Sequence, residues 1–263
     1  MNCYTVKTIR AGNTKTFRAY KTRPKIRGKR SPKTEPTPEA QKKNNLARAT
    51  WTLTWLLNEN FRDGDLLVTL QYKKGEAPEE YETMNRDARN FLDKLNRRYK
   101  RMTGRRIRYV RVMEIGKRGA RHHHVVLQEV ESRILRECWQ KGGIDIKPLY
   151  TDGNYRRIAE YFVKYAQTAE EAQRREMKKL WYASKGLKRP KESKGRKMSE
   201  RKALEIRVPD GYVLDEESIR RGTSSYDGFE TLIYLCVRME RRKCDRSKNL
   251  HRNHDPRPSP EKG

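Results

Sequence analysis

The sequence predicts an α+β fold in which helices flank a central antiparallel β-sheet of about five strands. The apolar patterns follow one another as helix, strand, helix, strand, strand, helix, strand and helix. The two adjacent strands in the middle are separated by a short glycine-containing turn, which is typical of an antiparallel hairpin. A doubly wound parallel sheet would alternate single strands with helices instead. The order of elements therefore favours helices packed on an antiparallel sheet.

The first half of this pattern begins with a helix over residues 37 to about 58. Thr37-Pro38-Glu39 supplies an N-cap residue, a first-turn proline and an early acidic residue. The stretch LLVTLQY at residues 66–72 is apolar and β-branched, so it predicts a strand. Pro78 opens a long amphipathic helix, which Thr103-Gly104 ends.

The second half contains the predicted hairpin. Residues 107–115 and 122–129 are expected to be its strands, with the turn at residues 116–119. A helix near residues 133–140, a short strand in IDIKPL and a helix from about Asn154 to beyond Ala166 complete the central domain, which we place at residues 37–183.

Both ends of the chain are basic and rich in proline and glycine. Residues 1–36 are expected to form an extended basic arm, which can include a short strand at its start and becomes ordered on nucleic acid. A merely solvated tail is the alternative. Residues 184–242 are interpreted as a basic linker with a small β extension, which includes a hairpin around Pro209-Asp210-Gly211 and a strand in ETLIYLCVRM. Residues 243–263 are expected to be a disordered tail.

The charge of the chain indicates a polyanionic partner. Its 63 Lys and Arg residues against 34 Asp and Glu residues give a formal net charge of +29. Binding to phosphates would neutralise that charge and release counterions, so nucleic acid is the expected partner. From the charge alone, a ribosomal-type RNA-binding protein without catalytic activity is the favoured interpretation. The four scattered cysteines and the absence of a long apolar run predict a cytosolic protein without a membrane span.

The stretch ARHHHVVL at residues 120–127 holds three histidines in a row. On a strand, side chains two residues apart share one face, so His122 and His124 point together and His123 points away. If the hairpin turns at residues 116–119, Glu114 lies opposite His122 on that same face. One carboxylate and two imidazoles can hold Mg²⁺ or Mn²⁺ with open positions for a phosphate. Exposed phosphate-binding histidines are the alternative interpretation.

The helix after the hairpin carries the sequence YFVKY at residues 161–165. Tyr161, Lys164 and Tyr165 stand at i, i+3 and i+4 and so share one helix face. Ile158, Ala159 and Phe162 form the adjoining apolar stripe that would face the sheet. A tyrosine hydroxyl and an ammonium beside a metal are what transesterification on DNA needs, although these tyrosines also fit an ordinary amphipathic helix.

Glu114, the histidine run and the Tyr-x-x-Lys-Tyr helix together resemble the HUH endonuclease superfamily, in the same order along the chain. The resemblance covers roughly residues 45–185 and is strongest to replication initiators of Gram-positive plasmids and phage-like mobile elements. Asn60-Phe61, the strand DLLVTLQY from Asp65, and YASKGLKRPK at residues 182–191 are similar to segments of those initiators. His123 departs from the family pattern, which usually has a bulky aliphatic residue between the two ligand histidines.

The resemblance implies a ferredoxin-like catalytic core and a role for each matching residue. Glu114, His122 and His124 would hold the divalent metal, and Tyr161 would attack single-stranded DNA to give a 5′-phosphotyrosine and a free 3′-OH. Lys164 would steady the phosphate or the metal-bound water, and Tyr165 would act as a second nucleophile.

The expected function is therefore that of a rolling-circle replication initiator that nicks and rejoins single-stranded origin DNA next to an origin hairpin. The sequence has no G-x-x-x-x-G-K-[ST] motif, so unwinding is expected to come from a host helicase in the bacterial cytosol. A transposase or relaxase of a mobile element, and a non-catalytic nucleic-acid-binding protein, remain alternatives. The expected DNA-binding residues share a basic side chain near the hairpin: Arg97, Arg98, Arg105, Arg106, Lys117, Arg118 and Arg121.

Overall fold

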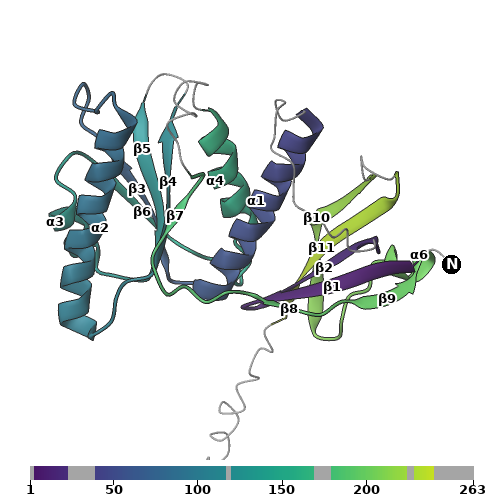
Figure 1. The fold of residues 1–263 in the computed structure, drawn as a ribbon. Coiled ribbons are helices and arrows are strands. Elements are labelled where there is room, and N and C mark those ends of the chain that lie inside the picture. Colours follow the sequence, from purple (N-terminus) through teal and green to yellow (C-terminus); the bar gives the residue numbers. More distant parts are fainter. Residues whose placement is uncertain (1–2, 23–38, 117–119, 169–178, 224–227, 240–263) are drawn as a thin grey trace, which may run out of the picture.

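The computed structural model describes residues 3–22, 39–116, 120–168, 179–223 and 228–239. Within these ranges the chain forms two antiparallel sheets and five helices (Figure 1). The central sheet has the order β6-β3-β5-β4-β7 and consists of β3 (Leu66–Gln71), β4 (Tyr109–Ile115), β5 (Arg121–Leu127), β6 (Ile144–Pro148) and β7 (Tyr182–Ala183). The predicted α+β class with a five-stranded antiparallel sheet is confirmed.

Helices cover both faces of the central sheet. α2 (Tyr81–Thr103) and α3 (Ser132–Cys138) pack on one face, around a core that includes Leu70, Phe91 and Trp139. α1 (Glu39–Asn60) and α4 (Arg156–Thr168) pack on the other, as Figure 1 shows. α2 ends where Gly104 adopts a φ of 71° and donates its backbone N–H to the carbonyl of Lys100, as the sequence predicts.

The hairpin of β4 and β5 has the predicted register. Glu114 pairs with His122, Val112 with His124, and Val110 with Val126. β5 also pairs with β3, where Thr69 lies opposite His124. The histidine strand is therefore an inner strand of the sheet, held on both sides by backbone hydrogen bonds.

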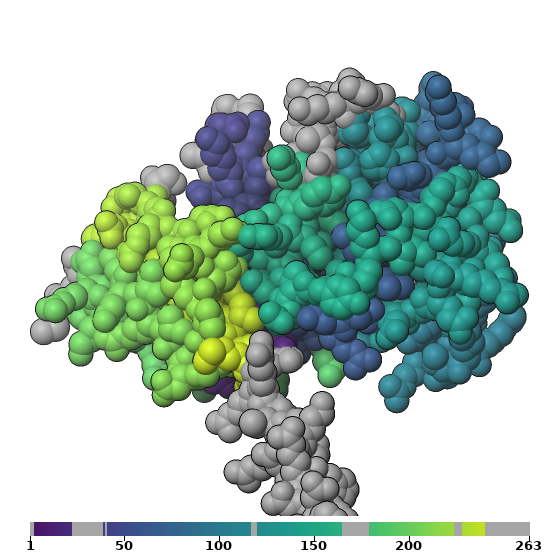
Figure 2. Space-filling view, turned by 180° about the vertical axis from the view of Figure 1, so that it is seen from behind, coloured from purple at the N-terminus to yellow at the C-terminus, as the bar shows by residue number. Residues whose placement is uncertain are grey.

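A second sheet, here called the terminal sheet, is built from both ends of the chain. It contains β1 (Cys3–Ala11), β2 (Thr14–Lys21), β8 (Lys191–Glu192), β9 (Arg196–Ser199), β10 (Tyr212–Thr223) and β11 (Glu230–Arg238). Along the path β10-β11-β2-β1-β8, β11 pairs with β2, and β9 pairs with β1 as a side branch. In the space-filling view from behind, the green and yellow residues of its C-terminal part lie beside the teal part of the chain (Figure 2).

The expectation of an extended N-terminal arm is wrong for residues 3–21, which are the strands β1 and β2. Basic side chains alternate here with buried ones such as Tyr4 and Ala19, and the buried set packs against residues of β11. That partner strand comes from the opposite end of the chain, so local composition alone indicated a solvated arm.

The C-terminal region also differs in detail from its prediction. The strand expected in ETLIYLCVRM is confirmed as β11, but residues 204–211 form no strand, so the hairpin around Pro209-Asp210-Gly211 is wrong. A one-turn helix, α6 (Glu200–Ala203), precedes this turn, and β10 begins after it and pairs with β11. The N-cap at Thr37, the turn residues 117–119 and the tail at residues 243–263 lie outside the described residues. The domain boundaries stay a prediction.

Candidate metal and nucleophile site

Glu114, His122 and His124 form one cluster on the α1 and α4 face of the central sheet. Their ligand atoms all lie within 4.8 Å of one another. His124 Nε2 lies 2.5 Å from Glu114 Oε2, and His122 Nε2 lies 3.7 Å from the same oxygen. Adjacent strands that pair Glu114 with His122 create this convergence, as strand alternation predicted.

Burial sets the protonation of the cluster. It lowers the pKa of His124 to about 4. Burial also lowers the pKa of His122, although the Glu114 carboxylate opposes that shift. The pKa of Glu114 is raised by burial, against the opposing effects of His122 and a hydrogen bond from Tyr161. Both imidazoles are thus neutral at pH 7, the state in which a histidine nitrogen has a lone pair for a metal.

The donor set fits a divalent cation. Bonds of about 2.0–2.2 Å place neighbouring ligand atoms about 3 Å apart, and the two distances to Glu114 Oε2 bracket that value. Thr69 Oγ1 lies 3.1 Å from His124 Nδ1, so an Nδ1–H donated to this hydroxyl would leave Nε2 free to bind. The His122 side chain is 23% exposed, which leaves one side of the cluster open to a phosphate.

His123 lies on the opposite face of the sheet, as predicted, and is fully buried. Its Nε2 lies 3.0 Å from the Tyr72 hydroxyl, and its ring meets that of Trp139 edge-on. Burial lowers the pKa of His123 to about 3, with smaller contributions from Arg111 and the neighbouring histidines. His123 therefore takes the core position that strand alternation assigns to it, and it does not contribute to the cluster.

Tyr161 joins the cluster from α4. Its hydroxyl lies 3.5 Å from His124 Nε2, and the two rings meet edge-on with centroids 5.3 Å apart. The neighbouring Ala159 and Phe162 are fully buried against the sheet, whereas Tyr161 remains 38% exposed. The predicted apolar stripe of α4 thus holds the helix, and Tyr161 beside it presents its hydroxyl at the ligand cluster. Lys164 is exposed on the same helix, and the side chain of Tyr165 lies outside the described residues.

Residues 65–170 match a family model for replication-associated proteins of the ORF2 and gene 2 protein type. Comparisons with curated proteins and with solved structures gave no match. The matched segment runs from the start of β3 through α4, so it contains Glu114, His122, His124 and Tyr161. It covers less than half of the chain and none of the terminal sheet. The central part of this protein is therefore similar to replication-associated proteins, and it contains a possible metal site.

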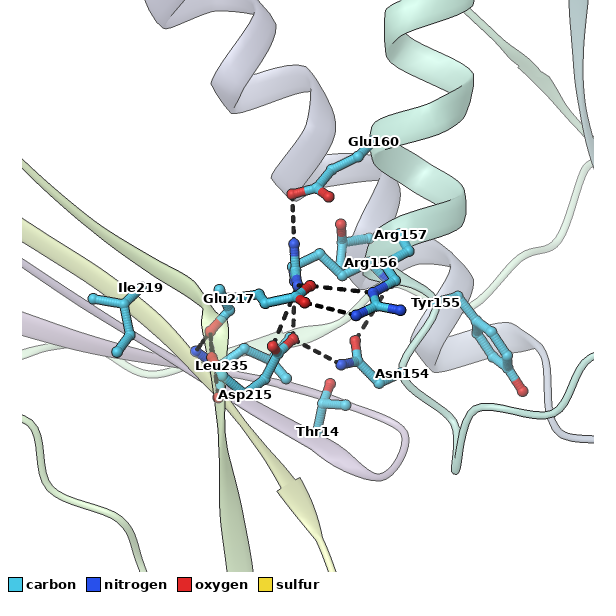
Figure 3. Close-up of polar contacts among 12 residues, drawn as sticks. Thr14, Asn154, Tyr155, Arg156, Arg157, Glu160, Asp215, Glu217, Ile219 and Leu235 are labelled. Atoms are coloured by element: carbon cyan, nitrogen blue, oxygen red, sulfur yellow. Dashed lines mark hydrogen bonds and ion pairs between the residues drawn. The ribbon is translucent and has the colours of Figure 1, made fainter.

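The matched segment is tied to the terminal sheet at the first turn of α4 (Figure 3). Arg156, whose side chain is 4% exposed, donates from Nε to Asp215 Oδ2 at 2.9 Å and from Nη1 to Glu160 Oε1 at 2.6 Å. The pairing of β10 with β11 shifts register between Asp215 and Arg220, and from this stretch Asp215 and Glu217 reach Arg156 of α4. Burial alone would raise the pKa of Asp215, but hydrogen bonds from Arg156 and Asn154 outweigh it and lower the pKa.

Sequence reasoning missed this contact and two others. From the sequence, Thr69 is expected only to be part of a strand, yet in the structure its hydroxyl is the hydrogen-bond partner of His124. Asn60 exchanges two hydrogen bonds of 2.8 Å with the backbone of Lys188, so two of the segments that carry the family resemblance meet in space. The residue types were visible in the sequence, but the pairing of β3 with β5 and the path of residues 182–191 were not.

The expected DNA-binding residues lie in different places. Arg97 and Arg98 are near the end of α2, and Arg105 and Arg106 follow it. These four residues precede β4, which begins at Tyr109. Glu114 lies five residues further along this strand, about 17 Å from Tyr109. Arg98 pairs with Glu137 of α3. Arg121 begins β5 beside His122, and Lys117 and Arg118 lie outside the described residues. Their role in DNA binding stays a prediction.

No helix among the described residues is long and apolar enough to cross a membrane.

Proposed function

We propose that this protein initiates rolling-circle replication by nicking single-stranded origin DNA and later rejoining it. The observation that carries the proposal is the 3.5 Å distance between the Tyr161 hydroxyl and His124 Nε2. A candidate nucleophile and a candidate metal site are thus adjacent, on two elements inside the segment that matches a replication-associated family. This combination supports DNA strand transfer over simple DNA binding.

Tyr161 is the proposed nucleophile. Its phenolic oxygen attacks the phosphorus of a scissile phosphodiester, the bond from phosphorus to O3′ breaks, and a 5′-phosphotyrosine forms. The phenolic proton is released and the departing O3′ takes up a proton, so charge is conserved. The new ester retains the energy of the original bond, and attack by a 3′-OH on the phosphotyrosine rejoins the strand.

Glu114, His122 and His124 would hold Mg²⁺ or Mn²⁺. When bound, the cation would withdraw electron density from the scissile phosphate and stabilise the charge that develops there. The partly exposed His122 leaves room for that phosphate, and the exposed Lys164 adds a positive charge on the same helix as Tyr161. Tyr165 is proposed as a second nucleophile, which would cut a second time while Tyr161 holds the first end.

The direct test incubates the protein with single-stranded DNA that carries candidate origin sequences and Mn²⁺, and looks for a covalent adduct on a denaturing gel. Wild type is expected to form the adduct, and Tyr161→Phe to lose it completely because the attacking oxygen is gone. Tyr165→Phe is the matched control and is expected to keep the first adduct. An adduct that persists in Tyr161→Phe would assign the nucleophile to Tyr165 instead. If wild type forms no adduct across a library of origins, the proposed nicking activity is refuted.

The same chemistry serves transposases and relaxases of mobile elements. An origin hairpin next to the gene would favour replication, and element termini on both sides of it would favour transposition.

A further inference from the structure

The terminal sheet contains a groove of about 670 Å³ between the β1–β2 hairpin and residues 191–209. Phe17 and Tyr234 line it, and their rings stack with centroids 5.1 Å apart. The groove lies outside the segment that matches the replication-associated family, and none of its residues takes part in the metal and nucleophile site.

The charge of the groove is strongly one-sided. Its two acidic residues are already neutralised, since Glu192 pairs with Lys7 and Glu205 pairs with Arg207. Six further basic side chains line it without an ion-pair partner among the described residues: Arg10, Lys15, Lys191, Lys194, Arg196 and Lys202. All but Lys15, which lies over the Tyr212 ring, are exposed. Like charges gathered in a concave surface repel one another and lose that repulsion when a polyanion binds.

The segment that carries Lys194 and Arg196 is fixed to β1. The Ser193 backbone N–H donates to the Thr8 carbonyl, and the Thr8 N–H donates to Ser193 Oγ, both at 2.9 Å. Gly195 has a φ of +89°, and a Cβ there would lie 2.8 Å from Thr5 Cγ2, so only glycine allows this close approach. The backbone that carries these two cations is therefore fixed before any ligand arrives, which lowers the part of the ordering cost that comes from the backbone.

We propose that this groove binds the sugar-phosphate backbone of DNA outside the nick site. Repeated phosphates match a set of cations that have no ion-pair partner among the described residues, and the partly apolar floor of Phe17 and Tyr234 suits contact with deoxyribose. The choice of DNA as the polyanion rests on the proposed function. The groove would then contact DNA in addition to the catalytic segment. Its cations come from the N-terminal basic stretch and from the basic stretch that follows the catalytic segment.

The test measures equilibrium DNA binding in a Tyr161→Phe background, so that cleavage does not interfere. The groove variant is Arg10→Ala with Arg196→Ala. The matched control is Lys94→Ala with Arg136→Ala, which removes the same charge from exposed side chains of α2 and α3. Affinity is measured over a range of salt concentrations for a single strand and for a hairpin duplex, with thermal unfolding to show that both variants fold.

The groove variant is expected to bind at least about tenfold more weakly than its parent, with the salt slope reduced by about two, or somewhat less on single-stranded DNA. The control pair is expected to lose much less. Loss on only one of the two DNAs identifies that form as the occupant. An equal loss in the control pair, a loss without a change in slope, or a loss on RNA but not on DNA would overturn the proposal. This comparison needs no cleavage, so it gives its answer even if wild type forms no adduct with Mn²⁺.

Discussion

The two sheets of this protein bury polar groups in different ways. The central sheet buries ionisable side chains, Glu114, His123 and His124, in the middle of its strands and under helices. The terminal sheet buries the hydroxyls of Thr14, Thr16 and Ser218 together with two tyrosines and the Cys236 thiol, and among its described strand residues no carboxylate, imidazole or basic side chain is buried. Burying an ionisable group costs much more than burying a hydroxyl that has a partner. Among the described strands, buried carboxylates and imidazoles thus occur in the sheet where the proposed chemistry takes place.

The terminal sheet instead stabilises the position of the elements beside that chemistry. Thr14 accepts from Asn58 of α1, and Thr16 accepts from Trp55 of the same helix. Asp215 holds the first turn of α4 through Arg156. Tyr161 follows Arg156 by about one and a half turns on that helix. The terminal sheet therefore helps to fix the position of the proposed nucleophile through α4. This division of roles can be broken experimentally at four places.

The largest expected effect is at the ligand cluster itself. His122→Ala removes one of three ligands and is expected to reduce adduct formation with Mn²⁺ by at least about a hundredfold. His123→Leu, which fills the buried position on the other face, is expected to retain most of the activity of the folded protein. The measurement is the rate of adduct formation on a denaturing gel. Comparable losses in the two variants would refute the assignment of His123 to the core.

The next largest effect is at the contact between the sheets. Asp215→Ala leaves the buried Arg156 with weaker partners, and we expect a loss of about 2–3 kcal/mol in the free energy of unfolding. Glu217→Gln is the matched control, because its carboxylate is 59% exposed and solvent screens its ion pairs with Arg156 and Arg157. Urea unfolding of both variants measures the difference. Equal stabilities would mean that the two sheets are not coupled through α4.

The same contrast explains how much the sequence could predict. The site was predictable because its ligands lie on one hairpin, where Glu114 and His122 are close in sequence and strand alternation sorts the histidines. The terminal sheet was not predictable, because β2 pairs with β11 from the far end of the chain. Nothing in the local sequence of either strand indicates that pairing. The ion pair of Asp215 with Arg156 could not be predicted for the same reason, because the two residues are 59 positions apart in the sequence.

A smaller effect is expected where a neutral residue supports the cluster. Thr69→Val removes the hydroxyl beside His124 Nδ1 while keeping the size of the side chain. Loss of such a partner typically costs about 10–100-fold in metal affinity, and we expect about tenfold here because the ring stays packed against Tyr161 and Phe162. Titration calorimetry with Mn²⁺ measures it. Thr52→Val, on the exposed surface of α1, is the control, and an equal change in both would exclude a role for Thr69.

The smallest effect is a pH dependence that originates on the far face of the central sheet. The pKa of His123 is about 3 in the folded protein and close to 6.5 when the chain unfolds. Between these values the unfolded chain binds one proton more, so the free energy of unfolding rises with pH by at most about 1.4 kcal/mol per unit from this group.

His123→Leu removes that contribution, and its stability is expected to fall less steeply than that of wild type as the pH drops from 6.5 toward 4. Urea unfolding at several pH values measures both slopes, and every other titrating group is common to the two proteins. Parallel slopes would show that His123 is protonated in the folded state and would contradict its burial as a neutral core residue. A shallower slope in His123→Leu, with adduct formation retained, would instead show that His123 contributes to stability and not to the proposed chemistry.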